Sequence, residues 1–184
     1  MDKDAFNNLM KRIRNNDMDA FREFYERYGK KIKTVAFYTV QDYHAAEDIL
    51  SDVMIKIWNG TFGEVDVPNG FIYKMARNTA LDFLRRDEKN RNALRYSEEL
   101  EQEAVATIDM LHMDIAVDDA LKKLGEMDKE VILKYVLFNY KFREIASDMK
   151  ISISAAQRRY RRVIKLLKKS CAQADSKKGE YQNE

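Results

Sequence analysis

The sequence predicts an all-α protein with two small helical domains joined by a flexible acidic linker. Its 184 residues include only six Gly and one Pro, whereas these two residue types make up about 12 % of an average protein. That scarcity argues against sandwiches, barrels and hairpin-rich folds. Apolar residues instead recur at three- and four-residue steps, which is the spacing of amphipathic helices. At roughly 150 residues per domain, the length fits one domain or two small ones.

The first predicted domain covers residues 1–90. Segments with helical spacing cover residues 5–14, 18–35, 43–58 and 71–86. Residues 59–70 contain three Gly, two Asn and the only Pro, so they form the expected main loop, with the next helix starting at Phe71.

An acidic linker, residues 91–112, is expected to follow. Residues 97–121 hold eight Asp or Glu and no Lys or Arg, whereas residues 141–184 hold twelve Lys or Arg against five Asp or Glu. The second predicted domain covers residues 113–170 and ends in two short helices, 141–149 and 154–169. A polar tail, residues 171–184, is expected to be disordered. The basic end of the chain would attract polyanions.

Composition disfavours several classes of function. The single Cys171 excludes an internal disulfide and a multi-Cys metal site, and it suggests a reducing compartment. No apolar run approaches the roughly 18 residues of a membrane span, and the first residues do not resemble a secretory signal. With two His and no Gly-rich phosphate loop or nucleophile–base pair, we expect no enzyme, no cofactor and no metal.

Residues 142–160 have the layout of a helix-turn-helix. Small Ala146 stands where two helices would cross closely, and Ser154 is the expected N-cap of the second helix. Lys150 occupies a turn position that usually holds Gly, so the turn is expected to differ in detail. Apolar residues expected to hold the turn to the core are Ile145, Met149, Ile151 and Ile153.

The second helix of this motif would expose a basic surface. Arg and Gln side chains read base edges in the major groove, and other cations hold phosphates. A helical hairpin with a basic surface is the structural alternative. The exposed residues expected here are Gln157, Arg158, Arg161, Arg162 and Lys165.

Two helices of the first domain also carry distinctive faces. Asp48 and Asp52 share one face of the helix over residues 43–58, opposite its apolar stripe. Like charges at this spacing repel, so a basic partner would relieve them, although the pattern by itself favours an ordinary solvated face. The helix over residues 71–86 interleaves aromatics with Arg and Lys, which suits single-stranded nucleic acid as well as an ordinary charged surface. Its non-core residues are Tyr73, Lys74, Arg77, Asn78 and Arg85.

Taken together, these motifs resemble bacterial RNA polymerase sigma factors of the extracytoplasmic-function (ECF) group. Residues 18–86 resemble sigma region two, through the runs Ala46–Trp58 and Tyr73–Arg86. Residues 117–169 resemble sigma region four, through Ala120–Leu124, Glu130–Ile132, Glu144–Ala146 and the helix after Ser154. The resemblance implies a factor without catalysis of its own that acts in the bacterial cytoplasm. It implies promoter DNA and the largest subunits of core RNA polymerase as partners, and an anti-sigma protein, often membrane-anchored, as a further one.

The resemblance also implies roles for individual residues. Polymerase docking would fall to Glu47, Asp48, Ser51 and Asp52. Opening and reading the minus-ten promoter element would fall to Asn59, Phe62, Tyr73, Lys74, Arg77, Asn78, Arg85 and Arg86. Reading the minus-thirty-five element as duplex would fall to Ser154, Ala155, Gln157, Arg158, Arg159, Arg161, Arg162 and Lys165.

Two other functions compete with this interpretation. A helix-turn-helix regulator with a sensing or dimerising domain would explain the basic helix, but it has no need of the two faces within residues 45–86. A structural helical adaptor would leave the basic helix unexplained.

Overall fold

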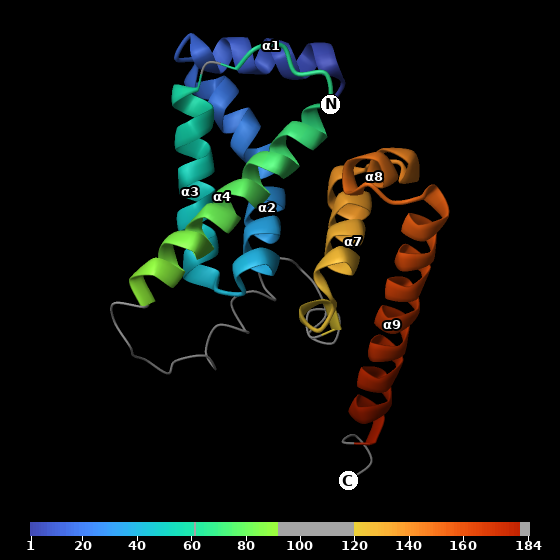
Figure 1. Ribbon diagram of the computed structural model, residues 1–184. Coiled ribbons are helices and arrows are strands. Elements are labelled where there is room, and N and C mark those ends of the chain that lie inside the picture. The colour runs from blue at the N-terminus through green and yellow to red at the C-terminus, as the bar shows by residue number, and fades with distance from the viewer. Residues whose placement is uncertain (61, 92–119, 181–184) are drawn as a thin grey trace. The chain divides into compact units, whose positions relative to one another are not determined.

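The computed structural model describes residues 1–60, 62–91 and 120–180, and all regular secondary structure within these residues is helical (Figure 1). The chain divides into two compact units, Met1–Ala106 and Thr107–Glu184. These observations confirm the predicted all-α, two-domain architecture. Of the expected linker, only its first residue lies within the described part of the chain.

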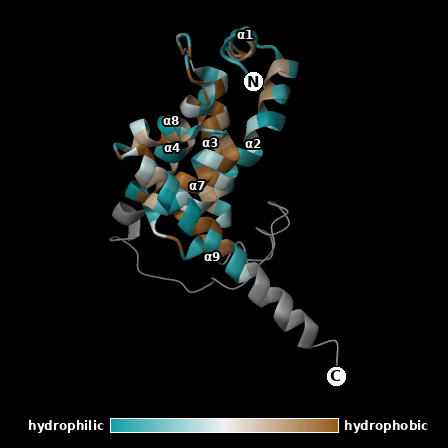
Figure 2. Cartoon of the chain, turned by 90° about the vertical axis from the view of Figure 1, so that its right-hand side faces the viewer, coloured by the Kyte–Doolittle hydropathy of each residue, from teal (hydrophilic) through white to brown (hydrophobic). Residues whose placement is uncertain are grey.

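The described residues of the first unit form a helical bundle made of α1 (Lys3–Arg14), α2 (Met18–Val40), α3 (Tyr43–Asn59) and α4 (Pro68–Arg91). Helix α2 packs against both α3 and α4, and α1 lies against α2 and α3. Hydrophobic and hydrophilic residues occupy different sides of these helices (Figure 2).

Three of these helices begin with an aspartate cap. The carboxylates of Asp2, Asp17 and Asp42 accept the backbone N–H three residues later, at 2.8, 2.9 and 2.7 Å respectively. Each bond satisfies a backbone donor that has no partner inside the helix.

The core of the first unit is aromatic and aliphatic. Phe6 of α1 and Phe24 of α2 are fully buried against Tyr28, with ring centroids 6.0 and 5.0 Å from the Tyr28 ring. Ile49 and Ile72 bring α3 and α4 into the same core.

Helix α4 is longer at both ends than the sequence predicts. It begins at Pro68, so the loop ends before the proline and the expected start at Phe71 is wrong. Proline suits the first helical turn, because its missing N–H would have no intrahelical acceptor there. At the other end α4 continues through Arg91, past the predicted end at Arg86.

The second unit contains α7 (Glu126–Phe138), α8 (Phe142–Met149) and α9 (Ile153–Glu180). Helices α8 and α9 both pack on α7 and on each other. Helix α9 continues to Glu180. The helix end expected near Lys169 and the disorder expected over residues 171–180 are therefore wrong. Residues 170–180 include two Ala, two Lys and one Gln, and these residue types favour helix.

The turn between α8 and α9 keeps the left-handed backbone despite its lysine. Lys150 has φ 54° and ψ 43°, and the next residue, Ile151, donates its N–H to the Ala146 carbonyl at 3.0 Å. The cap of α9 is Ser152, whose Oγ accepts the Ala155 N–H at 3.1 Å. The predicted cap, Ser154, instead lies in the first turn.

The apolar residues around this turn are buried to different extents. Ile145 and Ala146 are buried, as expected, whereas Met149 and Ile151 are half-buried. Ile153 is 44 % exposed, so the expectation that it holds the turn to the core is wrong.

Candidate protein and nucleic-acid interfaces

The exposed side of α3 carries an unpaired acidic surface. Asp48 and Ser51 are exposed and Asp52 is half-buried. One turn separates the two aspartates, and neither forms an ion pair within the described part of the chain. We call Asp48, Ser51 and Asp52 the α3 acidic face. Because no ion pair within the described residues offsets the repulsion between the two carboxylates, the face favours a cationic partner.

Glu47, predicted to belong with this face, has a partner inside the unit. Its Oε1 lies 2.5 Å from Nζ of Lys33 on α2, and that ammonium also donates to the Tyr43 hydroxyl at 2.9 Å. The bond from Lys33 lowers the pKa of Glu47. Burial alone would lower the pKa of Lys33, but its bonds to Glu47 and Tyr43 raise it overall. Lys33 closely follows two other lysines, Lys30 and Lys31, so the sequence did not single it out and its role was missed.

Most predicted minus-ten residues of α4 reach the surface. Lys74, Asn78, Arg85 and Arg86 are exposed, and Arg77 is half-buried. Lys74, Asn78 and Arg85 recur at helical steps, so they lie on one side of α4, which we call the α4 polar face. Arg85 is paired with Asp82 at 2.9 Å on the same helix. Asn59 is exposed at the end of α3.

Two predicted aromatic contacts lie against the protein itself. Tyr73 is only 2 % exposed, so the expectation that its ring lies on the non-core side of α4 is wrong. The half-buried ring of Phe62 packs edge-on against Phe71, with ring centroids 5.1 Å apart. Base stacking by either ring would require rearrangement of the unit.

Helix α1 holds the loop between α3 and α4. Asn7 makes two bonds with the Val65 backbone: its Oδ1 accepts the N–H at 2.9 Å and its Nδ2 donates to the carbonyl at 3.2 Å. Arg14 donates to the Phe62 carbonyl at 2.9 Å, and Lys3 pairs with Asp66 at 2.6 Å. Sequence reasoning missed these contacts, because a side chain bound to a distant backbone leaves no pattern in the sequence.

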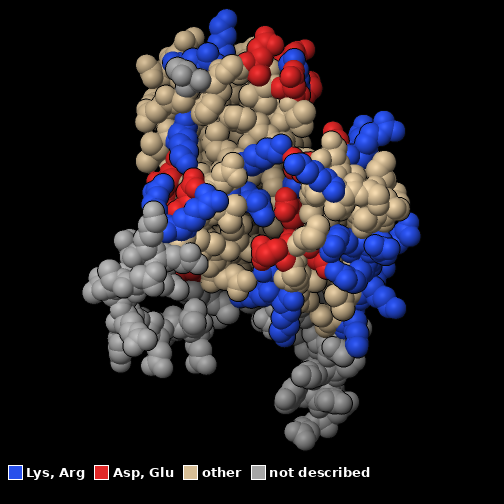
Figure 3. All heavy atoms as spheres, viewed as in Figure 1, with Lys and Arg blue, Asp and Glu red and all other residues tan. Residues whose placement is uncertain are grey.

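One side of α9 carries a continuous basic stripe, formed by Arg158, Arg161, Lys165 and Lys168. All four side chains are exposed, and none forms an ion pair within the described residues. Figure 3 shows Lys and Arg side chains gathered over α9. Exposed Ser154 begins the same side of the helix, and Gln157 and Ala155 are half-buried beside it. This stripe has the charge needed to bind phosphates and the residue types needed to read bases.

Arg159 and Arg162, also predicted to contact DNA, are bound to a carboxylate of α7. Nη1 of Arg159 lies 2.8 Å from Oδ1 of Asp128, and Nη2 of Arg162 bonds to Oδ2. The Asp128 side chain is 6 % exposed. The spacing in the sequence indicates part of this arrangement. Arg159 stands three residues after Ala156 and four before Val163, both buried, so it lies on the inward side of α9.

A buried lysine joins α7 to α8. Lys134 is fully buried, and its Nζ lies 2.5 Å from Glu130 and 2.7 Å from Asp148. Burial, followed by these acidic neighbours and Glu144, raises the pKa of nearby Tyr140.

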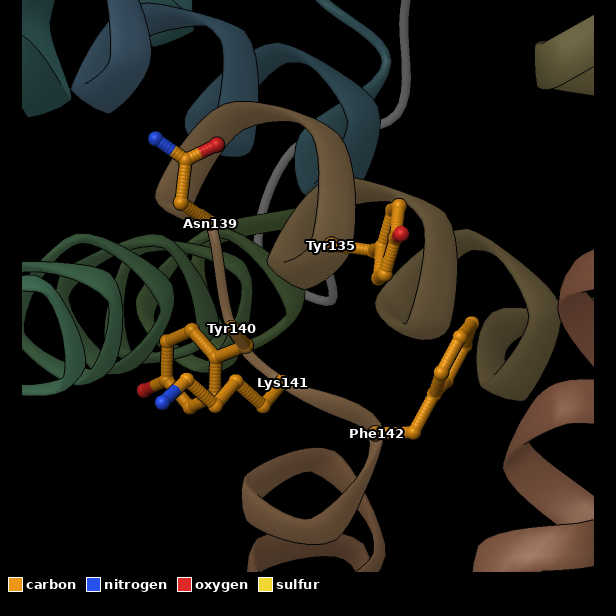
Figure 4. A pocket seen from close by; sticks show the side chains of 5 residues that line it. All are labelled: Tyr135, Asn139, Tyr140, Lys141 and Phe142. Atoms are coloured by element: carbon orange, nitrogen blue, oxygen red, sulfur yellow. The ribbon is translucent and has the colours of Figure 1, made fainter.

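An aromatic cluster lies beside the buried lysine. The rings of Tyr135 and Phe142 stack with centroids 4.7 Å apart, and Tyr160 of α9 lies 4.5 Å from Tyr135. A hollow of about 390 Å³ opens between this cluster, Asn139, Tyr140 and Lys141 (Figure 4).

The described residues show neither a metal-binding cluster nor a membrane-spanning helix. Those residues contain no group of three or more His, Cys, Asp or Glu side chains placed to hold a metal ion. No described helix is long and apolar enough to cross a membrane.

Comparison with known protein families gives a consistent match for each unit. The family model for sigma-70 region 2 matches residues 24–90, and the model for sigma-70 region 4 matches residues 114–167. Both matches fall on the units that carry the α3 acidic face, the α4 polar face and the basic stripe.

Individual proteins give the same match. The chain is 24 % identical over 161 residues to the ECF RNA polymerase sigma factor SigX of Bacillus subtilis (strain 168), covering 82 % of this chain and 83 % of the relative. It also matches CnrH, solved in complex with the cytosolic domain of CnrY, with a TM-score of 0.57, 18 % identity and coverage of 91 % and 96 %. In the RsbN–BldN complex, the match covers 87 % and 97 % at 18 % identity, with a TM-score of 0.34.

Proposed function

The chain belongs to the sigma-70 family and is a sigma factor of the ECF group, and we propose that it directs core RNA polymerase to promoters through three surfaces. These are the α3 acidic face, the α4 polar face with its adjoining loop, and the basic stripe of α9. Each surface has a chemistry suited to a different partner.

The α3 acidic face docks on a basic surface of the largest polymerase subunits. Its two aspartates are accessible and have no cation beside them within the described residues. Glu47 contributes less, because its carboxylate is already neutralised by Lys33. Asp48 and Asp52 are therefore the principal docking residues of the predicted set.

The α4 polar face holds the minus-ten element after the strands separate. Lys74 and Arg85 supply positive charge for phosphates, and Asn78 supplies an amide for a base edge. Backbone groups of the loop residues Phe62 and Val65 are held by side chains of α1, so a captured base would meet a pre-organised surface.

The basic stripe of α9 reads the minus-thirty-five element as duplex. A helix fits the major groove, and Arg pairs bidentately with guanine there. Arg158, in the exposed first part of α9, is the leading candidate for base reading, and Lys165 and Lys168 lie farther along for phosphate contacts.

The factor has no catalytic activity of its own and works in the bacterial cytoplasm. An anti-sigma protein would hold it inactive. The matched CnrH was solved with a bound protein, the cytosolic domain of CnrY, which supports a protein partner of this kind.

The observation that carries the proposal is that one unit has an acidic face and the other a basic stripe. Neither surface forms an ion pair within the described residues. The test is co-migration with purified bacterial core RNA polymerase on gel filtration, using the wild type, D48K/D52K and a control, D19K. Asp19 is an exposed aspartate of α2 outside all three surfaces. We expect a one-to-one complex that only the double reversal abolishes, with helicity unchanged.

Absence of a complex with the folded wild type would refute the polymerase proposal. Specific binding of duplex DNA by the protein alone would then favour a helix-turn-helix regulator.

A further inference from the structure

We propose that Asp128 sets the orientation of the recognition helix, and that Arg159 and Arg162 hold it there instead of contacting DNA. The inference rests on the proposed function of α9 and deepens it, because it separates the arginines that bind DNA from those that position the helix. We call Asp128, Arg159 and Arg162 the Asp128 clamp.

Geometry supports this division of the arginines. Both Asp128 oxygens are used, one by each guanidinium. Arg159 is half-buried and also donates to the Met127 sulfur at 3.5 Å, so its planar group lies along the start of α7. By contrast, Arg158 and Arg161 are exposed and form no ion pair within the described residues, whereas the Arg162 side chain is 58 % exposed but bonds to Asp128.

Position on the helices supports it as well. Asp128 lies in the first turn of α7, where the backbone N–H groups favour negative charge. Arg159 follows buried Ala156 and precedes buried Val163, so its row on α9 faces the unit and not the solvent. The clamp therefore joins the start of α7 to the part of α9 that enters the groove.

Burial explains why the clamp restricts orientation. A carboxylate that is 6 % exposed cannot be satisfied by water, so it depends on the two guanidinium groups. Any roll of α9 about its axis would pull at least one arginine from Asp128. The exposed stripe of α9 is thereby held at one angle, which direct base reading requires.

The consequence is a split within the basic surface. Arg158, Arg161, Lys165 and Lys168 determine binding to DNA, and the Asp128 clamp determines how well they discriminate between sequences. Loss of a clamp arginine should then weaken discrimination without removing a phosphate contact.

The experiment uses the full-length protein bound to core RNA polymerase. A duplex pool randomised at the upstream element is first selected with the wild-type complex, and the selected duplex is then compared with a scrambled one. The variants are D128N, R159M, D128N/R159M and R162M, with K123Q as a control for loss of one exposed cation outside the clamp. Thermal unfolding by circular dichroism checks that each variant is folded at the assay temperature.

Three results are expected. D128N and R159M each lower the ratio of selected to scrambled binding at least tenfold, and the double variant is no worse than either alone. The logarithmic slope of binding against salt stays at the wild-type value for R159M and R162M, because no phosphate contact is lost. K123Q leaves the ratio unchanged.

Other results overturn the inference. If D128N keeps the wild-type ratio, or if R159M lowers it further in the D128N background, Arg159 acts on DNA independently of Asp128. A salt slope reduced by about one for R159M or R162M marks a direct phosphate contact. If a variant is unfolded at the assay temperature, the comparison is made with R159K, which retains the charge but loses the planar fork and must lower the ratio if the clamp is right. Failure of the wild-type complex to select any sequence refutes the proposed function instead.

Discussion

The two units bury different kinds of side chain. In the first unit, the largest fully buried side chains are Tyr28, Phe6 and Phe24, whereas in the second a fully buried side chain of comparable size is Lys134. The second unit also buries Asp128 between two arginines. A small unit has little apolar surface to bury, and this one adds paired charges between its helices. Such pairs tolerate few geometries, so they favour a defined orientation of α9 over maximal stability.

The largest expected effect comes from removing the buried cation. Lys134→Ala leaves Glu130 and Asp148 facing each other in a buried site, and it should destabilise the second unit by about 3–5 kcal/mol. The only tryptophan, Trp58, lies in the first unit. We therefore expect the circular-dichroism melt to acquire an early transition while the Trp58 fluorescence melt keeps the wild-type midpoint.

The matched control for this prediction is Phe24→Ala, a cavity mutation in the first unit. It should cost about 3–5 kcal/mol as well, but it should shift the Trp58 transition. Equal shifts of the fluorescence midpoint by both variants would contradict the independence of the two units.

A second prediction concerns the loop held by α1. Asn7→Ala removes both bonds to the Val65 backbone and should destabilise the first unit by about 1–2 kcal/mol. Strand opening at the minus-ten element should fall further than polymerase binding, because the loop loses its fixed position. Permanganate reactivity of unpaired thymines measures opening, and gel filtration measures binding. Exposed Asn8→Ala, on the same helix, is the control.

The left-handed turn of the second unit offers a stabilising substitution. Lys150→Gly should raise the free energy of unfolding of that unit by about 1 kcal/mol, since a side chain at φ 54° is strained. Asn139 has a similar φ of 52°, but Asn tolerates this region better, so Asn139→Gly should gain less. Circular-dichroism melts compare the two. A destabilised Lys150→Gly would mean that the side chain makes contacts that outweigh its strain.

The smallest expected effect is the pH dependence of the Lys33–Glu47 pair. In the folded state the pKa of Glu47 lies below its ordinary value of 4.5. The pair therefore stabilises the first unit above pH 4.5, and this contribution is lost as the pH falls through the folded pKa of Glu47. Glu47→Gln should therefore be less stable than the wild type at pH 7, and the difference should shrink as the pH is lowered below 4.5. Trp58 fluorescence melts measure this difference, and a pH-independent gap would contradict the assignment.

Periodic apolar spacing predicted most of the fold, because every helix of these units turns one apolar side toward the core. The sequence did not reveal where α4 begins, because Asn69 and Gly70, which favour loops, follow Pro68. It also did not reveal that α9 continues past Lys169, where no apolar stripe marks the helix.

The spacing of Asp48 and Asp52 drew attention to the α3 acidic face, but its docking role was predicted only from the resemblance to sigma factors. Tyr73 and Arg159 were assigned to DNA because residue type was considered without the neighbours that bury or bind them.

The central claim, that each unit handles one promoter element, is tested most directly by footprinting an open complex on a single promoter. Arg158→Ala and Asn78→Ala are compared in complexes saturated with polymerase. We predict that Arg158→Ala loses protection of the minus-thirty-five element while thymines at the minus-ten element stay reactive to permanganate. Asn78→Ala should do the reverse. Loss of both signals with either substitution, or an exchange of the two patterns, would contradict the claim.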